Sequence, residues 1–179
     1  MPLDIGLGIV SAMLISEIFS IKISTGLILY GILFALLPDI DFLILSSKNA
    51  YQRRDSLTHY PLLYFPLGGI ILWLGLGKII ALLFILASFL HFLHDGIGTS
   101  WGLKWLYPFD ERWHKFLGRK FGQLKFLASW TPDELTRDVK LQRQDTWFRE
   151  TYFRPSPILI TEVIGLIIAI VSLVFWLRG

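Results

Sequence analysis

The chain has 179 residues, of which 54% are hydrophobic and 17% are charged, with a formal net charge of +3 and a mean hydropathy of +0.57. This composition lies well to the apolar side of soluble domains, and the length leaves room for one compact bundle rather than two ordinary domains. The absence of cysteine excludes disulfides, thiolate nucleophiles and zinc ribbons.

Five segments are apolar enough to cross a bilayer, which takes about 17 to 25 residues per helix. We place them at about 5–21, 25–45, 60–76, 78–95 and 157–177. The N-terminus lacks the basic region of a cleavable signal peptide, so the first segment is expected to stay in the protein as a helix. The sequence therefore predicts an all-α integral membrane helical bundle with about five transmembrane helices.

The stretch between the fourth and fifth segments is too polar to span a membrane. Apolar and basic residues recur there at helical spacing, which predicts an interfacial amphipathic helix. These residues are Trp113, Phe116, Leu117, Lys120 and Leu124. Thr131-Pro132-Asp133-Glu134 is a capping box with proline at the first helical position, so we expect a second helix from about Pro132 to Glu150.

Five crossings assign every loop to one side of the membrane. All Lys and Arg residues lie on the side of the N-terminus except Lys22, Lys78 and Arg178. By the positive-inside bias that side is cytoplasmic, which places the C-terminus outside an inner or plasma membrane. The predicted organisation is a four-helix core over 1–109, a cytoplasmic segment over 110–156 and a last transmembrane helix over 157–179.

Acidic and histidine side chains interrupt the apolar runs at one predicted membrane level. They are Asp4, Asp39, Asp41, His59, His91 and Asp95. Burying such groups costs roughly several kcal/mol unless they bind something, and a cation would account for all six. His91 and Asp95 share one helix face, and Pro38 disturbs the helix so that Asp39 and Asp41 could both turn inward. This oxygen-rich set predicts one or two divalent ions, zinc first, with manganese, iron or magnesium as alternatives.

Four motifs, in order and spacing, carry a resemblance to a known family. They are Leu37-Pro38-Asp39-Ile40-Asp41, Arg54 through Thr58-His59, His91-Phe92-Leu93-His94-Asp95, and Trp101-Gly102 with Tyr107-Pro108-Phe109. Residues 1 to about 110 thereby resemble the YdjM-like membrane-bound metal-dependent hydrolases, and more distantly the bacterial zinc-dependent phospholipases C. That family usually has a histidine four residues before a glycine near the start, where this chain has Asp4 and Gly8.

The resemblance implies a hydrolase whose metal activates water for attack on a phosphorus or carbonyl centre. The expected catalytic residues are Asp39, Asp41, His59, His91 and Asp95, with Arg54 bracing an anionic phosphate. A site at the interface suits membrane lipids and a lipid or phosphoester substrate rather than nucleic acid. We expect His94 to pack or to bond to backbone, and Glu162 on the last helix is a candidate to support the site.

Simpler interpretations stay open at this point. His91 with Asp95 could be a helix-end ion pair, and His59 an interfacial residue. Two other functions compete with the hydrolase. A metal-ion carrier would place acids near the bilayer midplane with a route to both faces. A metal-free lipid phosphatase would need a lysine–arginine clamp and a Pro-Ser-Gly-His loop, where this chain offers only Ser56-Leu57-Thr58-His59.

Overall fold

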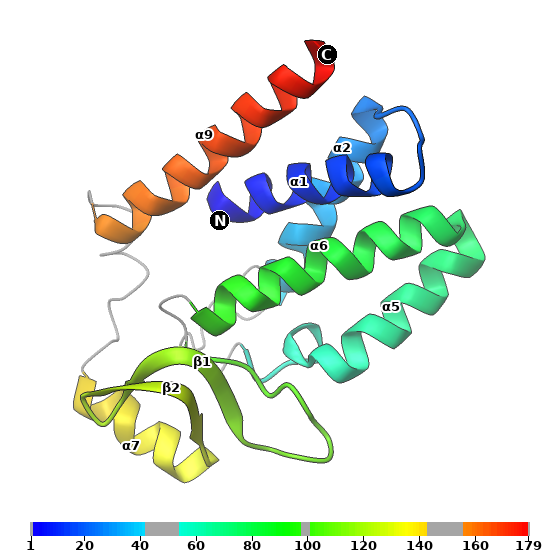
Figure 1. The fold of residues 1–179 in the computed structure, drawn as a ribbon. Helices are drawn as coiled ribbons and strands as arrows, with labels where there is room; N and C mark the ends of the chain where they lie inside the picture. Colours follow the sequence, from blue (N-terminus) through cyan, green and yellow to red (C-terminus); the bar gives the residue numbers. More distant parts are fainter. Residues whose placement is uncertain (1, 42–53, 98–100, 143–155, 179) are drawn as a thin grey trace.

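A computed structural model describes residues 2–41, 54–97, 101–142 and 156–178 and is mostly helical (Figure 1). Its α-helices are α1 (Pro2–Ile18), α2 (Thr25–Leu36), α5 (Pro61–Leu76), α6 (Lys78–Ile97), α7 (Pro132–Gln142) and α9 (Pro157–Arg178). Two short 3₁₀ helices, η1 (Leu37–Ile40) and η2 (Leu57–His59), follow α2 and precede α5. The helical segments predicted near 5–21, 25–45, 60–76, 78–95 and 157–177 are thus present, and 42–45 lie outside the described residues.

The helical bundle is built on α1, α2 and α6, which pack against one another, while α5 pairs with α6 and α9 lies along α1 (Figure 1). An apolar core fills the space between them. It consists of Ala12, Ile15, Leu27, Phe34, Ala35, Leu83, Phe84 and Ala87. The side chain of Ser24 caps α2 by accepting the Leu27 N–H at 3.2 Å, and Gly77 ends α5 with a φ of 91° that favours glycine.

A close approach of two backbones fixes α1 against α2. A side chain on Gly8 would overlap the backbone of Gly31 and Ile32, and one on Gly31 would overlap the Gly8 carbonyl. Only glycine therefore fits at these two positions with the helices this close. Because Asp4 lies one turn before Gly8 on α1, this contact also sets where the Asp4 carboxylate stands.

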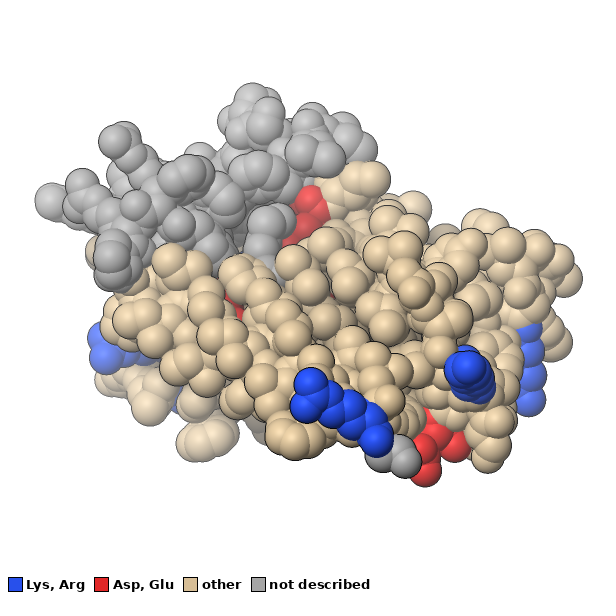
Figure 2. All heavy atoms as spheres, turned by 90° about the horizontal axis from the view of Figure 1, so that it is seen from above, with Lys and Arg blue, Asp and Glu red and all other residues tan. Residues whose placement is uncertain are grey.

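Two of the described helices, α6 and α9, are long and apolar enough to cross a membrane. The segments Thr25–Ile40 and Pro61–Leu76 are apolar but shorter, so the helix lengths support two of the five predicted crossings. The exposed surface of α9 is rich in isoleucine, valine and leucine. When the molecule of Figure 1 is seen from above, the described surface that faces the viewer carries few charged side chains (Figure 2).

The segment predicted to be an interfacial helix is instead a β-hairpin, so the all-α prediction is wrong here. Strands β1 (Trp113–Lys120) and β2 (Gln123–Trp130) pair antiparallel, with Lys120 opposite Gln123. Phe121 and Gly122 connect them with φ of 49° and 80°, the positive values of a tight two-residue hairpin turn.

The hairpin and α7 enclose a second, smaller apolar core. Its buried members are Trp101, Trp113, Ala128, Trp130 and Leu135. The capping box predicted for α7 is confirmed, because Glu134 N–H donates to the Thr131 hydroxyl and Thr131 N–H donates to the Glu134 carboxylate. The described part of α7 ends at Gln142, and the predicted continuation to Glu150 lies outside the described residues.

Candidate metal centre

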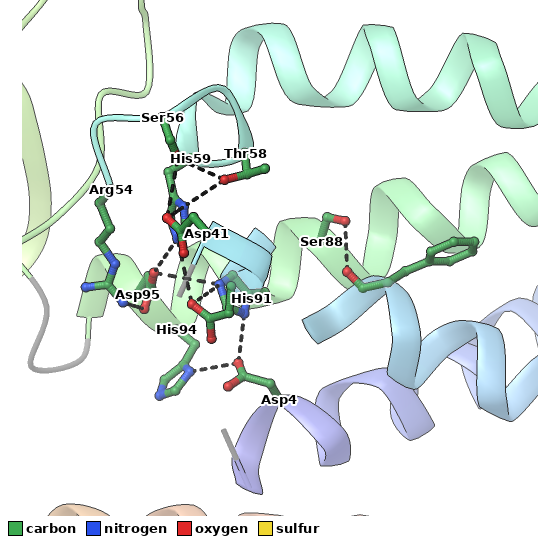
Figure 3. Close-up of polar contacts among 12 residues, drawn as sticks. Asp4, Asp41, Arg54, Ser56, Thr58, His59, Ser88, His91, His94 and Asp95 are labelled. Atoms are coloured by element: carbon green, nitrogen blue, oxygen red, sulfur yellow. Dashed lines mark hydrogen bonds and ion pairs between the residues drawn. The ribbon is translucent and has the colours of Figure 1, made fainter. Parts of the chain in front are cut away.

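The side chains predicted to form the site meet at one end of the bundle (Figure 3). Asp4 comes from the first turn of α1, Asp39 from η1, His59 from η2, and His91 with Asp95 from the last turns of α6. The structure therefore brings these groups together, although they are spread over the first 95 residues.

Four donor atoms, from Asp39, His59, His91 and Asp95, lie close together at the centre of this cluster. The Oδ1 atom of Asp39 lies 3.9 Å from Nε2 of His59 and 4.0 Å from Nε2 of His91. Asp95 Oδ2 lies 3.7 Å from each of the same two nitrogens. Both histidines are almost completely buried, with 0% and 1% of their surfaces exposed.

The spacing and the hydrogen bonding of these atoms fit a divalent ion. Bonds of about 2.0 to 2.2 Å around a tetrahedral ion place its ligand atoms about 3.3 to 3.6 Å apart, and the carboxylate–nitrogen distances of 3.7 to 4.0 Å lie a few tenths of an ångström above that range. Within the described residues, neither Nε2 of His59 nor Nε2 of His91 has a hydrogen-bond partner. Since buried polar atoms are almost always bonded, two such nitrogens facing one carboxylate indicate a ligand site. Asp39, His59 and His91 could hold a metal ion.

The outer nitrogen of each histidine contacts its own carboxylate. Asp41 Oδ2 lies 3.0 Å from Nδ1 of His59, and Asp4 Oδ1 lies 3.1 Å from Nδ1 of His91. A carboxylate at Nδ1 holds the proton on that atom and leaves the Nε2 lone pair for a metal. Asp4 and Asp41, which the sequence placed among the metal ligands, therefore stand behind the two imidazole rings in this structure.

The chain around Pro38 explains how both acids of the second helix reach His59. Pro38 lies in the first turn of η1, where the α-helix gives way to a tighter 3₁₀ turn. This change of pitch brings Asp39 to one edge of the His59 ring and Asp41 to the other, which confirms the prediction that both turn inward. Asp41 also accepts a hydrogen bond from the Ser56 hydroxyl at 3.3 Å.

His94 has a polar partner that the sequence did not reveal. Its Nδ1 atom lies 3.1 Å from Asp4 Oδ1, the same oxygen that contacts His91 (Figure 3). The expectation that His94 packs or bonds to backbone is wrong, because α1 brings Asp4 beside it from 90 residues away. Glu162 is buried on α9, the helix that lies along α1, and its proposed supporting role stays a prediction.

Basic side chains line the side of the cluster that faces the hairpin. Arg54 Nη2 donates to Asp95 Oδ1 at 2.7 Å, so Asp95 bridges Arg54 and the two histidines. Lys115 on β1 is also buried, with 8% of its surface exposed. Burial, and to a lesser extent the charge of Arg54, lowers the pKa of the Lys115 ammonium to about 8, although the charge of Asp95 opposes this shift. Sequence reasoning missed Lys115 because it assigned the residue to an interfacial amphipathic helix.

A second buried lysine ties the His59 loop to the hairpin. Lys104 Nζ donates to Asp55 Oδ1 at 2.6 Å and lies 5.3 to 6.0 Å from the ring centres of Trp113, Tyr107 and Tyr60. The Tyr60 hydroxyl donates to the same Asp55 oxygen at 2.5 Å. Because Asp55 lies four residues before His59, this contact helps to hold the loop that carries that histidine.

Comparison with known proteins gives one match. A family model described as "YdjM inner membrane protein" matches residues 4–177, a range that includes all the residues of the cluster, the whole of α6, and α9 except its last residue. No curated protein and no solved structure matches the chain.

Proposed function

The chain belongs to the YdjM inner membrane protein family, and we propose that its polar cluster is the metal centre of a membrane-embedded hydrolase. The proposed substrate is an ester or phosphoester of a lipid or lipid-like molecule. One observation supports the metal centre most strongly. Two deeply buried atoms, Nε2 of His59 and Nε2 of His91, face the Asp39 carboxylate and have no hydrogen-bond partner among the described residues.

Each residue of the cluster has a defined task in this proposal. Asp39, His59 and His91, joined by Asp95, hold the ion; two nitrogens and two oxygens suit zinc first, with manganese, iron or magnesium as alternatives. The bound ion supplies Lewis acidity, which activates water and polarises the scissile group. Asp4 and Asp41 keep the imidazoles in the ligating tautomer.

The membrane setting supports a lipid-like substrate. In this proposal the chain crosses the membrane about five times, with its N-terminus in the cytoplasm and the site at that face. Most of the exposed side chains of α5 and α9 are apolar, as contact with lipid requires. Phe121, Leu124 and Phe126 on the hairpin are exposed as well, and aromatic and aliphatic groups of this kind suit the membrane–water interface.

The test is turnover of a substrate panel by the purified full-length protein in detergent. The panel comprises a phosphomonoester, a phosphodiester and a carboxylic ester, each as a lipid and as a soluble analogue. We expect hydrolysis of at least one, loss of turnover after chelation, and recovery on adding back zinc or manganese. His59→Gln should abolish turnover. His114→Gln, which alters a histidine of the hairpin outside the cluster, should retain it.

Two results would contradict the proposal. One is turnover that persists after complete removal of metal, which would favour a metal-free lipid phosphatase. The other is metal uptake into vesicles that contain the protein, with no hydrolysis of any member of the panel, which would favour a carrier.

A further inference from the structure

A cavity of about 440 Å³ lies at the end of the bundle opposite the metal centre. Helices α1 and α9 run in the same direction, and both contribute their last turns to its wall (Figure 1). Because Asp4 stands in the first turn of α1, the length of this helix separates the cavity from the metal centre. Pockets that hold small ligands commonly measure about 300 to 1,000 Å³, so this cavity has room for a ligand of its own.

The cavity wall carries one charge of each sign. Glu17 comes from the last turn of α1, and Lys22 comes from the turn that leads to α2. Both residues are exposed, and neither forms an ion pair with another residue of the described chain. Helix α1 has no basic residue in its last turn, so the partial negative charge of its final carbonyl groups adds to that of Glu17. The cavity therefore suits a ligand that carries a cation and an anion close together.

Hydrogen bonds fix the turn that brings the two charges to one cavity. Ile21 N–H donates to the Ser16 carbonyl at 3.0 Å, and Ser20 N–H donates to the Glu17 carbonyl at 3.1 Å. The Ser16 hydroxyl donates to the Ile21 carbonyl, and Ser20 takes a positive φ of 50°. These bonds fold the chain back over the end of α1. The backbone that carries Lys22 is thus held in place before a ligand binds, which lowers the entropy cost of binding.

The rest of the cavity wall is largely apolar and continues into the surface of α9. Trp176 and Leu177 line the cavity from the last turn of that helix. Tryptophan favours the boundary between lipid and water, because its ring is apolar and its N–H is polar. The neighbouring Val174 and Phe175 are exposed, and α9 is long and apolar enough to cross a membrane. A ligand with its charged head in the cavity can therefore lay an apolar chain along α9.

We propose that this cavity binds the headgroup of a zwitterionic phospholipid with a primary ammonium, the class that includes phosphatidylethanolamine. In this site Lys22 pairs with the phosphate, and Glu17 accepts N–H hydrogen bonds from the ammonium two carbons away. A choline headgroup has no N–H to donate, and a glycerol headgroup brings no cation to Glu17. The inference goes beyond the proposed hydrolase and does not depend on it, because the two sites lie at opposite ends of α1.

The test is native mass spectrometry of the full-length protein in detergent with an equimolar mixture of three phospholipids. Phosphatidylethanolamine, phosphatidylcholine and phosphatidylglycerol are used with identical acyl chains. We expect the protein to retain phosphatidylethanolamine about fivefold more than either of the others, the effect of one partly exposed ion pair. Glu17→Gln should reduce its retention to the level of phosphatidylcholine, and Lys22→Gln should reduce it about fivefold.

Lys78→Gln is the matched control for these variants. Lys78 is an exposed lysine at the first residue of α6, at the same end of the bundle but outside the cavity. Its replacement should leave the wild-type preference unchanged. Equal retention of the three lipids by the wild type, or a wild-type preference in Glu17→Gln, would overturn the site.

A second measurement on the wild-type protein does not depend on how the variants fold. A phosphatidylethanolamine analogue with a photoreactive group at the start of one acyl chain is cross-linked to the protein, and the labelled peptides are identified. Labels are expected within residues 16–23 or 171–177, and excess phosphatidylethanolamine should suppress them more than excess phosphatidylglycerol. Labels confined to other parts of the chain would overturn the site.

One variant separates this inference from the proposed function. His59→Gln removes a proposed metal ligand and should keep both the lipid preference and the cross-links. Loss of phosphatidylethanolamine binding in His59→Gln would show that the lipid binds at the metal centre, and would overturn the second site. Failure of the protein to hydrolyse any ester would remove the hydrolase and leave the lipid site standing.

Discussion

Replacing Asp4 by asparagine tests whether Asp4 orients the metal ligand His91 or is itself a metal ligand. In the structure Asp4 Oδ1 lies 3.1 Å from Nδ1 of both His91 and His94, and its side chain is 2% exposed. The Asp4→Asn substitution keeps the size and one acceptor oxygen but removes the charge that holds the proton on Nδ1 of His91. The Nε2 lone pair is then a weaker and less well oriented donor for the metal.

The expected size of the effect follows from that position. Loss of a partner behind a ligating histidine weakens metal binding by about 10- to 100-fold, which corresponds to about 1.4 to 2.7 kcal/mol. Loss of a direct ligand should be more severe, so Asp39→Asn is the comparison. Glu17→Gln is the matched control, because Glu17 is an exposed carboxylate near the other end of the same helix, and its replacement should leave the affinity unchanged.

The assay is competition for zinc between the detergent-solubilised protein and a chromophoric chelator. Thermal unfolding of each variant without metal shows whether the fold is intact. The reasoning is refuted if Asp4→Asn binds zinc as tightly as the wild type. It is refuted equally if Asp4→Asn loses zinc as completely as Asp39→Asn, because Asp4 would then be a ligand itself.

Three further predictions concern the parts of the fold that position the site. Gly31→Ala forces α1 away from α2 at Gly8 and should destabilise the protein by about 1–3 kcal/mol; unchanged thermal unfolding in detergent would contradict that close approach. Lys104→Met removes a buried cation from Asp55 and three aromatic rings and should cost about 1–2 kcal/mol, measured in the same way, while an unaltered midpoint would show that this contact is not stabilising. Thr131→Ala removes the cap of α7 and should cost about 1 kcal/mol, with faster amide exchange in the first turn of that helix; exchange that stays at the wild-type rate would rule out the cap.

The helices and the meeting of the acidic and histidine side chains could be predicted from the sequence because both depend on local patterns. Long apolar runs mark the helices, and their order places His59, His91 and Asp95 at the same end of the bundle. Pro38 marks the break that turns Asp39 and Asp41 inward. The roles of single acids could not be predicted this way, because whether a carboxylate faces Nε2 or Nδ1 depends on how α1 and η1 pack against the two histidines.

The hairpin was missed because one of its inward positions holds a lysine. Trp113 and Lys115 are both buried on β1, and a charged residue at the second position hides the alternation of a strand. A turn signal was nevertheless present, because Phe121-Gly122 lies between two runs of mixed polarity and glycine accepts the positive φ of a tight hairpin turn. The buried lysine that obscured the strand is also the residue that the structure brings beside Asp95.

Anomalous X-ray scattering from crystals of the zinc-loaded protein tests the metal centre most directly. The account predicts one anomalous peak bonded to Nε2 of His59, Nε2 of His91, Oδ1 of Asp39 and Oδ2 of Asp95, at distances of about 2.0 to 2.2 Å. Zinc bound between Asp4 and His94, or no peak among these four donors at full zinc loading, would contradict it.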